Sequence, residues 1–189
     1  KEQPIVYNNR KMCIEFLNLE KGDQIIYGKN NLNVCIKSLI EKEIMQVSPE
    51  IYMMIQPEYD FLFKLLIMYG REQSRLKINH IICLESMIQK QENRYNLNCL
   101  NILAPMLMSP CNYEVYYYYD NIQSHFYNMN FFPYIILTSE FLLIITSDFE
   151  YGILSDDKEK SDLFKSLFKQ YLERTNKLFE INANLQDVS

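Results

Sequence analysis

Apolar residues recur every three or four positions in two segments of the first half of the chain, which is the spacing of one helix face. The first segment predicts a helix from Leu32 to about Gln46, with Asn30 or Asn31 as its N-cap. In the second segment, Pro57 favours a helix start and Gly70 a helix stop. The expected buried stripe of this second helix is Phe61, Leu62, Leu65, Leu66 and Tyr69.

The middle of the chain changes to a period of two, which is typical of a strand. From Leu76 to Cys83, even-numbered positions including His80 face one side and odd-numbered positions the other; the alternative is the start of a helix that continues beyond residue 85. Residues 96–109 return to helical spacing, and Pro105 predicts a kink or an early end there. Near the N-terminus, residues 12–19 and 23–28 are short strand-like runs, and the turn at Gly22 between them favours a hairpin.

Three β-rich runs follow in the last third of the chain: Tyr113–Tyr119, Tyr134–Leu137 and Phe141–Thr146. Only a short turn separates the last two, which predicts an antiparallel pair, and residues 151–154 favour a further short strand.

The chain then predicts a helix whose first N–H groups are capped by Ser155, Asp156 and Asp157, with Arg174 and Lys177 towards its other end. Its apolar face should be buried on the preceding strands; the expected members are Phe164, Leu167, Phe168, Tyr171, Leu172, Leu178 and Phe179. The predicted class is α/β (or α+β): a layered mixed β-sheet flanked by helices, ending in a long amphipathic C-terminal helix.

Length and charge narrow the picture further. With 189 residues and 48% hydrophobic content, residues 1–189 suit a single domain. The net charge is −5 and no basic run exceeds two residues, so we expect any contact with DNA to be made by a module outside this sequence. The chain begins at Lys1 without an initiator Met, which favours a fragment with a DNA-binding module upstream. No apolar run reaches the roughly 20 residues of a membrane span, so we expect no membrane contact.

Candidate chemistry is sparse. Five widely spaced cysteines without a CxxC pair indicate reduced core thiols, and hence a cytoplasmic location. The two histidines, His80 and His125, lie far apart and form no HExxH or HxH motif, so the sequence predicts no metal site and no cofactor. The sequence also lacks GxSxG, GxGxxG and P-loop motifs.

Five tyrosines lie between Tyr113 and Tyr119, in a chain without tryptophan. On a strand, Tyr113, Tyr117 and Tyr119 share one face, which we assign to the core, while Tyr116 and Tyr118 share the other with acidic residues. For that second face the sequence leaves two interpretations open: burial under another layer, or the lining of a ligand cavity or dimer surface. Tyr116 and Tyr118 are the candidate ligand-binding tyrosines.

Asp148 and Glu150 are further candidates because they directly follow an apolar strand, where ligand-facing residues often lie in layered folds. A solvated loop is the simpler interpretation. With His125 and the two tyrosines, these carboxylates could also assemble a small hydrolase or transferase site, which requires their side chains to converge on one cleft.

The order of elements from residue 113 to 180 resembles the effector or accessory domain that follows the helix-turn-helix of some Firmicute transcriptional regulators of the Cro/CI (XRE) type. The residues that carry the likeness are Tyr116–Tyr119, Phe132–Tyr134, Ser147 with Asp148, Gly152, and Phe164–Phe179. The order is also similar to half of a phospholipase-D-like fold. Catalytic members of that superfamily require HxK, whereas His80 is followed by Ile81 and Ile82 and His125 by Phe126 and Tyr127, so the resemblance implies no such activity.

These observations favour a non-catalytic sensing and dimerisation domain of a cytoplasmic transcriptional regulator. We expect it to form a homodimer, to bind a small-molecule or peptide effector, and to reach DNA only through the upstream module. The alternatives are the small enzyme described above and a structural domain that pairs with another chain.

Overall fold

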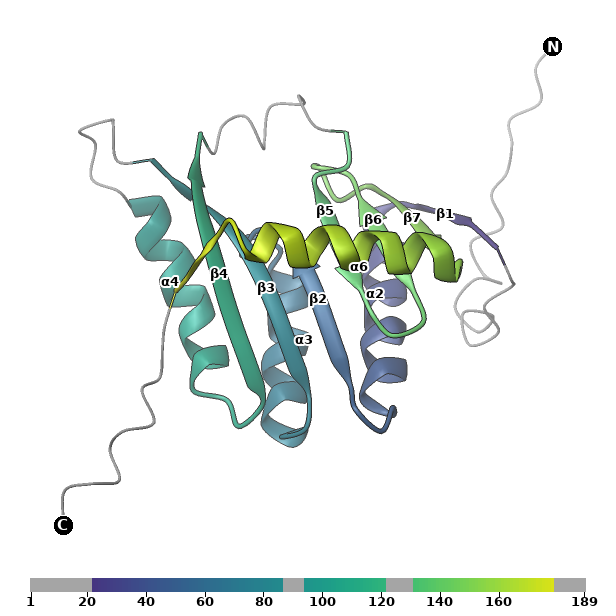
Figure 1. The fold of residues 1–189 in the computed structure, drawn as a ribbon, viewed down its shortest axis with the longest axis horizontal. Helices are drawn as coiled ribbons and strands as arrows, with labels where there is room; N and C mark the ends of the chain where they lie inside the picture. The colour runs from purple at the N-terminus through teal and green to yellow at the C-terminus, as the bar shows by residue number, and fades with distance from the viewer. Residues whose placement is uncertain (1–21, 87–93, 122–130, 179–189) are drawn as a thin grey trace.

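The computed structural model describes residues 22–86, 94–121 and 131–178. These residues form one eight-stranded mixed sheet with the strand order β1-β7-β6-β5-β2-β3-β4-β8 (Figure 1). The strands are β1 Gln24–Tyr27, β2 Glu50–Met54, β3 Lys77–Glu85, β4 Asn112–Asp120, β5 Tyr134–Leu137, β6 Leu142–Ile145, β7 Tyr151–Ser155 and β8 Asn176–Lys177. The helices are α2 Lys29–Ile44, α3 Asp60–Glu72, α4 Arg94–Leu107 and α6 Lys158–Leu172.

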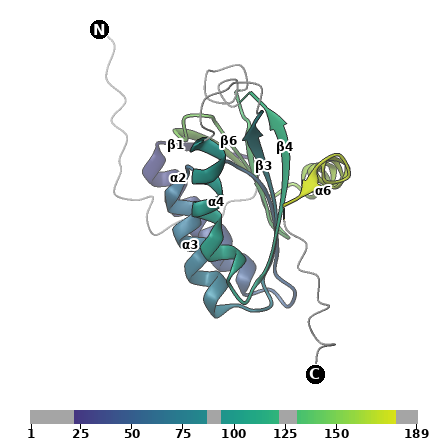
Figure 2. The ribbon, with the colours of Figure 1, turned by 90° about the vertical axis from the view of Figure 1, so that its left-hand side faces the viewer.

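Three strands in the middle of the sheet, β2, β3 and β4, are parallel and are joined through α3 and α4, while every other pairing is antiparallel. Of the helices in the described residues, α2, α3 and α4 cover one face of the sheet and α6 crosses the other (Figure 2). This arrangement confirms the predicted fold class. It also leaves the two faces of the sheet unequally covered, because one helix covers less of the sheet than the three helices on the opposite face.

The main core lies between the sheet and the three-helix layer. The predicted stripes of α2 and α3 are buried there, among them Ile36, Ile40, Leu62 and Leu66. Each fully buried Ile or Leu contributes about 1.5–3 kcal/mol relative to an exposed one, so this layer dominates the stability of the fold.

The first helix starts earlier than its apolar spacing suggests. Helix α2 begins at Lys29, its N-cap is Gly28 with φ 81°, and no side chain caps it, so the predicted capping by Asn30 or Asn31 is wrong. Instead the Asn31 amide donates to the Tyr27 carbonyl at 2.8 Å, and the Gly28 N–H donates to the Glu150 carbonyl at 2.7 Å. Glycine tolerates positive φ at no steric cost, which is what the sharp turn from β1 into α2 requires.

Gly70 does not stop the second helix. Helix α3 starts at Asp60, three residues after Pro57, and continues through Gly70 to Glu72. A Cβ at position 70 would lie 2.8 Å from Ser109 Oγ and 3.0 Å from Cys111 Sγ. The glycine therefore allows the chain between α4 and β4 to approach the helix closely, a packing role that looks like a stop signal in sequence.

Strand β2 has no counterpart among the predicted elements. Its residues Ile51, Tyr52 and Met53 are all buried because helices cover one face and α6 the other. A strand buried on both sides lacks the apolar–polar alternation by which a strand is identified in the sequence.

The predicted strands β3 to β7 are confirmed, including the antiparallel β5–β6 pair and the short β7. Strand β1 pairs with β7; the other half of the predicted N-terminal hairpin lies outside the described residues. Helix α4 contains Pro105 and ends at Leu107.

Of the three predicted capping residues, Asp157 is confirmed as the N-cap of the last helix, whereas Ser155 belongs to β7 and Asp156 Oδ1 accepts from the Gly22 N–H; the helix also ends sooner than predicted. Asp157 Oδ1 accepts from the backbone N–H groups of Glu159 at 2.9 Å and Lys160 at 3.4 Å. Helix α6 then ends at Leu172, so Arg174 lies beyond it and Lys177 belongs to β8. The predicted burial of its apolar face holds only in part: Phe168 is 4% exposed, whereas Leu167 is 37% and Tyr171 46% exposed.

Candidate ligand-binding groove

Alternation along β4 divides its tyrosines between the two faces of the sheet. Tyr113, Val115 and Tyr117 pack into the main core, which confirms the face assigned to the core from sequence. Tyr119 lies on the same side near the strand end and is 52% exposed. Tyr116 and Tyr118 point to the opposite face, where they pack beside the smaller apolar cluster formed with α6.

On this second face, seven side chains from neighbouring strands lie directly beside one another and form a row across the sheet. Its members, each paired with the next, are Ile25, Ile153, Ile144, Ile135, Met54, Ile81 and Tyr116. The neighbouring row, Leu142, Leu137 and Tyr52, is buried beneath α6, with the Phe168 ring in edge contact with Tyr52 at 5.3 Å. Because α6 lies over one row, the adjacent row is left only partly covered along most of its length.

A groove of about 500 Å³ lies beside α6 and includes Met54 and Ile135 of this row. Met54, Ile135 and Leu137 lie along the sheet side of the groove, and Tyr118 contributes from β4. Helix α6 supplies one wall through Phe164, Leu167, Phe168 and Tyr171. The chain that leads into β5, Phe131–Pro133, supplies the other wall.

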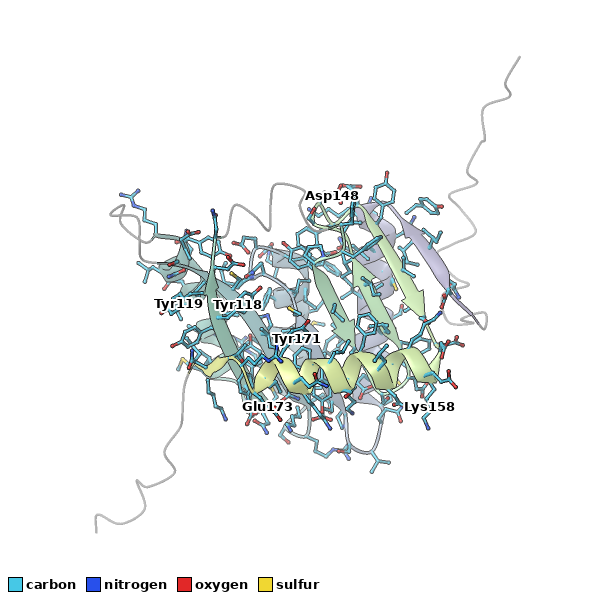
Figure 3. All side chains as sticks on the ribbon, turned by 45° about the horizontal axis from the view of Figure 1, so that its top comes forward. Tyr118, Tyr119, Asp148, Lys158, Tyr171 and Glu173 are labelled. Atoms are coloured by element: carbon cyan, nitrogen blue, oxygen red, sulfur yellow. The ribbon has the colours of Figure 1, made fainter. Side chains whose placement is uncertain are left out.

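A second pocket of about 380 Å³ shares Met54, Tyr118 and Tyr171 with the first, so the two pockets adjoin. We call the combined feature the α6 groove. Its extension adds Ile81 and reaches Arg174 and Thr175, just beyond the end of the helix. Figure 3 shows Tyr118 and Tyr171 on this side of the sheet, near the carboxyl end of α6.

Most side chains that line the α6 groove are apolar; those of Tyr118, Tyr171, Arg174 and Thr175 carry polar groups. Tyr118 is half-buried, and burial together with the neighbouring Cys83 raises the pKa of its phenol above the usual range. Thr175 donates its hydroxyl to the Leu172 carbonyl at 2.9 Å. The phenol therefore stays neutral in the physiological range, and Arg174 carries the charge at this end.

Tyr116 lies beside the α6 groove. Its hydroxyl donates to Glu114 Oε2 at 2.8 Å, and Lys177 Nζ lies 3.1 Å from Glu114 Oε1 and 5.9 Å from the Tyr116 ring centre. Burial, followed by the bond to Glu114, raises the pKa of Tyr116 to about 12. These contacts link β4 to β8 at the sheet edge and give Tyr116 a structural role of its own.

The two candidate carboxylates, Asp148 and Glu150, lie in the exposed turn between β6 and β7. Asp148 Oδ1 accepts from Thr146 Oγ1 at 2.6 Å and from the Glu150 N–H at 3.0 Å, and these bonds hold the pKa of Asp148 below its usual value. The turn places Phe149 at φ 59°, an uncommon conformation for a bulky residue.

The constrained Phe149 completes a stack of three rings. It stacks on Tyr59 at 4.3 Å between centroids and on Tyr134 at 4.8 Å, with interplanar angles of 4° and 5°. The hydrogen bonds of Asp148 thus position Phe149, and this explains the carboxylate without a ligand.

The structure does not bring the described candidates together. Strand β6 is separated from β4 by four inter-strand spacings, about 19 Å at about 4.8 Å each. Figure 3 likewise shows Asp148 well apart from the Tyr118–Tyr171 pair. His125 lies outside the described residues. The convergence on one cleft that the enzyme hypothesis requires is therefore not met by Tyr116, Tyr118, Asp148 and Glu150.

Within residues 22–86, 94–121 and 131–178, no group of three or more His, Cys, Asp or Glu side chains is arranged to hold a metal ion. Over the same ranges, no helix combines the length and apolar character needed to cross a bilayer.

Sequence reasoning missed most of the α6 groove. Helical spacing predicts core positions for Phe164, Leu167, Phe168 and Tyr171, and the helix dipole accounts for Arg174, so neither signal points to a groove. The spacing identifies an apolar helix face but carries no information on how completely a sheet covers it. Only the register of the sheet reveals that one row is left partly open.

No protein-family model and no curated protein matches the chain. Among solved structures, the fold is similar to that of TrmBL2, described as an archaeal chromatin protein with a novel mode of DNA binding. The TM-score is 0.51 and the sequence identity 14%, and the match covers 86% of this chain and 56% of TrmBL2. The chain thus spans a little over half the length of TrmBL2, and the likeness is one of fold.

Proposed function

We propose that this chain is the non-catalytic sensing domain of a cytoplasmic transcriptional regulator and that its effector binds in the α6 groove. The groove itself carries the proposal. The first pocket of the groove, of about 500 Å³, falls within the roughly 300–1,000 Å³ typical of small-molecule sites, and such sites are mostly apolar with a few polar groups.

The way α6 is anchored suits a sensor. At its start, Lys160 Nζ lies 2.5 Å from Asp23 Oδ2, and the Ser155 hydroxyl donates to Asp23 Oδ1 at 2.6 Å. Beyond its end, the Leu178 N–H donates to the Val115 carbonyl at 2.8 Å. Between these anchors few side chains of α6 are buried, so a ligand in the groove can favour one placement of the helix over another.

Two likenesses support the regulatory part of the proposal. TrmBL2, which shares the fold, binds DNA according to its description. The sequence over residues 113–180 resembles effector domains of XRE-type regulators, in which a separate helix-turn-helix contacts DNA. We place the DNA-binding function in such a module, because the acidic net charge of −5 disfavours direct phosphate contact.

Dimerisation belongs to the same proposal. Among the described residues, β1 pairs with β7 and is the outermost strand on that side of the sheet, and its Ile25 and Tyr27 side chains are largely exposed. An edge strand with exposed apolar side chains is suited to pairing with a second copy. Light scattering should therefore give the mass of a homodimer, and a strict monomer at all concentrations would count against this part.

The sensing function is tested by thermal-shift screening of a mixed library of neutral, anionic and cationic metabolites and short peptides. We expect at least one class to raise the melting temperature, because a ligand that binds only the folded state stabilises it. A matched variant, Phe132→Ala, removes one exposed wall of the groove and should reduce the shift. Leu97→Ala, an equally peripheral change on α4, should not.

A further inference from the structure

The chemical character of the α6 groove narrows the class of its effector, an inference that rests on the proposed function. The lining is apolar over most of its length: Met54, Ile135, Phe164 and Leu167 offer no hydrogen-bonding side-chain group. A ligand that fills this part must therefore present a hydrocarbon or aryl surface. A sugar or nucleotide would lose bonds to water beside these four side chains, which cannot replace them.

One end of the α6 groove carries a positive charge without an acidic side chain beside it in the lining. Arg174 is the charged residue among the described lining residues of the two pockets, and no acidic side chain lines either. Within the described part of the chain, its guanidinium makes no hydrogen bond or ion pair. Nearby lysines differ: Lys165 Nζ lies 3.5 Å from Glu50 Oε2, and Lys177 is paired with Glu114.

From these two features we infer that the α6 groove binds an amphipathic carboxylate. The apolar tail lies along Met54 and Ile135 between α6 and the Phe131–Pro133 segment, and the carboxylate meets Arg174. A guanidinium presents paired N–H donors that match the two oxygens of a carboxylate, a stronger and more directional contact than a neutral donor provides. In an acidic protein, an unpaired arginine at the end of an apolar groove is suited to this class of ligand and unsuited to a cation.

The inference is tested with three ten-carbon probes of matched tail and different head group: decanoate, 1-decanol and decyltrimethylammonium. Calorimetric titration is performed on the wild type, on Arg174→Gln and on Lys169→Gln. Lys169 is the matched control, because it is an exposed cation in the last turn of α6 and does not line either pocket. All probes are kept below their micellar concentrations.

We expect decanoate to bind the wild type most tightly, 1-decanol more weakly and decyltrimethylammonium least. Arg174→Gln should weaken decanoate binding about tenfold, the scale of one charge-assisted contact, and leave 1-decanol unchanged. Lys169→Gln should leave all three affinities within about twofold. Added salt should weaken only the decanoate complex with an intact Arg174.

Each other outcome has a distinct meaning. Equal binding of decanoate and 1-decanol, insensitive to Arg174→Gln, overturns the carboxylate inference while leaving the groove as the sensing site. A preference for the cationic probe overturns it as well. If none of the probes binds but a metabolite or peptide from the mixed library does, the ligand class is wrong and the sensing function stands. If nothing in either experiment binds, both fail.

Discussion

His80 Nδ1 and the Tyr113 hydroxyl lie 2.7 Å apart in the interior of the sheet, joining β3 to β4. The other ring nitrogen, Nε2, lies 2.7 Å from the Ile55 carbonyl, which can only accept a hydrogen bond. Nε2 therefore carries the proton, Nδ1 accepts from Tyr113, and a neutral imidazole satisfies both partners. Complete burial lowers the pKa of His80 to about 4, although the bond to Ile55 opposes the shift.

This depressed pKa predicts an acid-sensitive fold. Between about pH 6.5 and pH 4 the unfolded chain binds a proton at His80 that the folded chain does not, so stability is full above pH 6.5 and falls as the pH drops. The shift corresponds to a loss of about 3 kcal/mol, as an upper figure. Urea unfolding at pH 7.0, 6.0 and 5.0 measures this loss of unfolding free energy. In the upper part of this pH window most carboxylates are still ionised, so their titration contributes little to the change.

The control is His80→Gln, which removes the titrating group at the cost of some stability. Its free energy of unfolding should change much less between pH 7.0 and 5.0 than that of the wild type. An identical pH slope in the two proteins would show that His80 is not the group responsible.

Two buried tyrosines should respond in opposite ways to loss of the hydroxyl. Tyr113→Phe leaves His80 Nδ1 without its donor, which should cost about 1–3 kcal/mol of unfolding free energy. The Tyr134 hydroxyl is buried without a hydrogen-bond partner among the described residues, so Tyr134→Phe should be neutral or stabilising. Chemical denaturation of both variants checks the pair, and equal losses would contradict the assignment.

The extent to which sequence predicted this structure depends on how local each signal is. Asp157 caps α6 as expected because a cap involves only the next few residues, and the faces of β4 follow from strict alternation. Strand β2 was not predicted because burial on both sides removes the apolar–polar alternation of its sequence. The α6 groove could not be predicted, since Met54, Ile135 and Tyr171 meet only through the sheet register and the path of α6.

Glu43 illustrates a non-local polar contact that should be costly to remove. Its carboxylate is 2% exposed; Oε1 accepts from the Glu50 N–H at 2.8 Å, and Oε2 accepts from the Ser139 N–H at 2.8 Å and hydroxyl at 2.7 Å. It thus connects the end of α2 to the start of β2 and to the β5–β6 turn.

We therefore expect Glu43→Ala to lower the free energy of unfolding by about 3 kcal/mol or more, because three donors lose their acceptor. Glu41→Ala on the same helix removes a more exposed carboxylate and should cost clearly less. Equilibrium unfolding of both variants gives the comparison. A Glu43→Ala protein as stable as Glu41→Ala would show that these bonds contribute little.

Variants in the turn that contains Asp148 can distinguish a structural role of this residue from a ligand-binding role. If Asp148 serves to hold Phe149 between Tyr59 and Tyr134, Asp148→Ala should lower the free energy of unfolding by about 1 kcal/mol, the scale of the two hydrogen bonds it loses. Phe149→Ala should cost more, about 2–3 kcal/mol, because it removes the central ring of the stack.

Both variants should bind the groove probe decanoate as the wild type does, since the turn lies several strands away from Tyr118. Denaturation and calorimetry on the same preparations measure the two effects together. A stable Asp148→Ala protein with lost ligand affinity would instead place this carboxylate in the binding site and move that site to the β6–β7 end of the sheet.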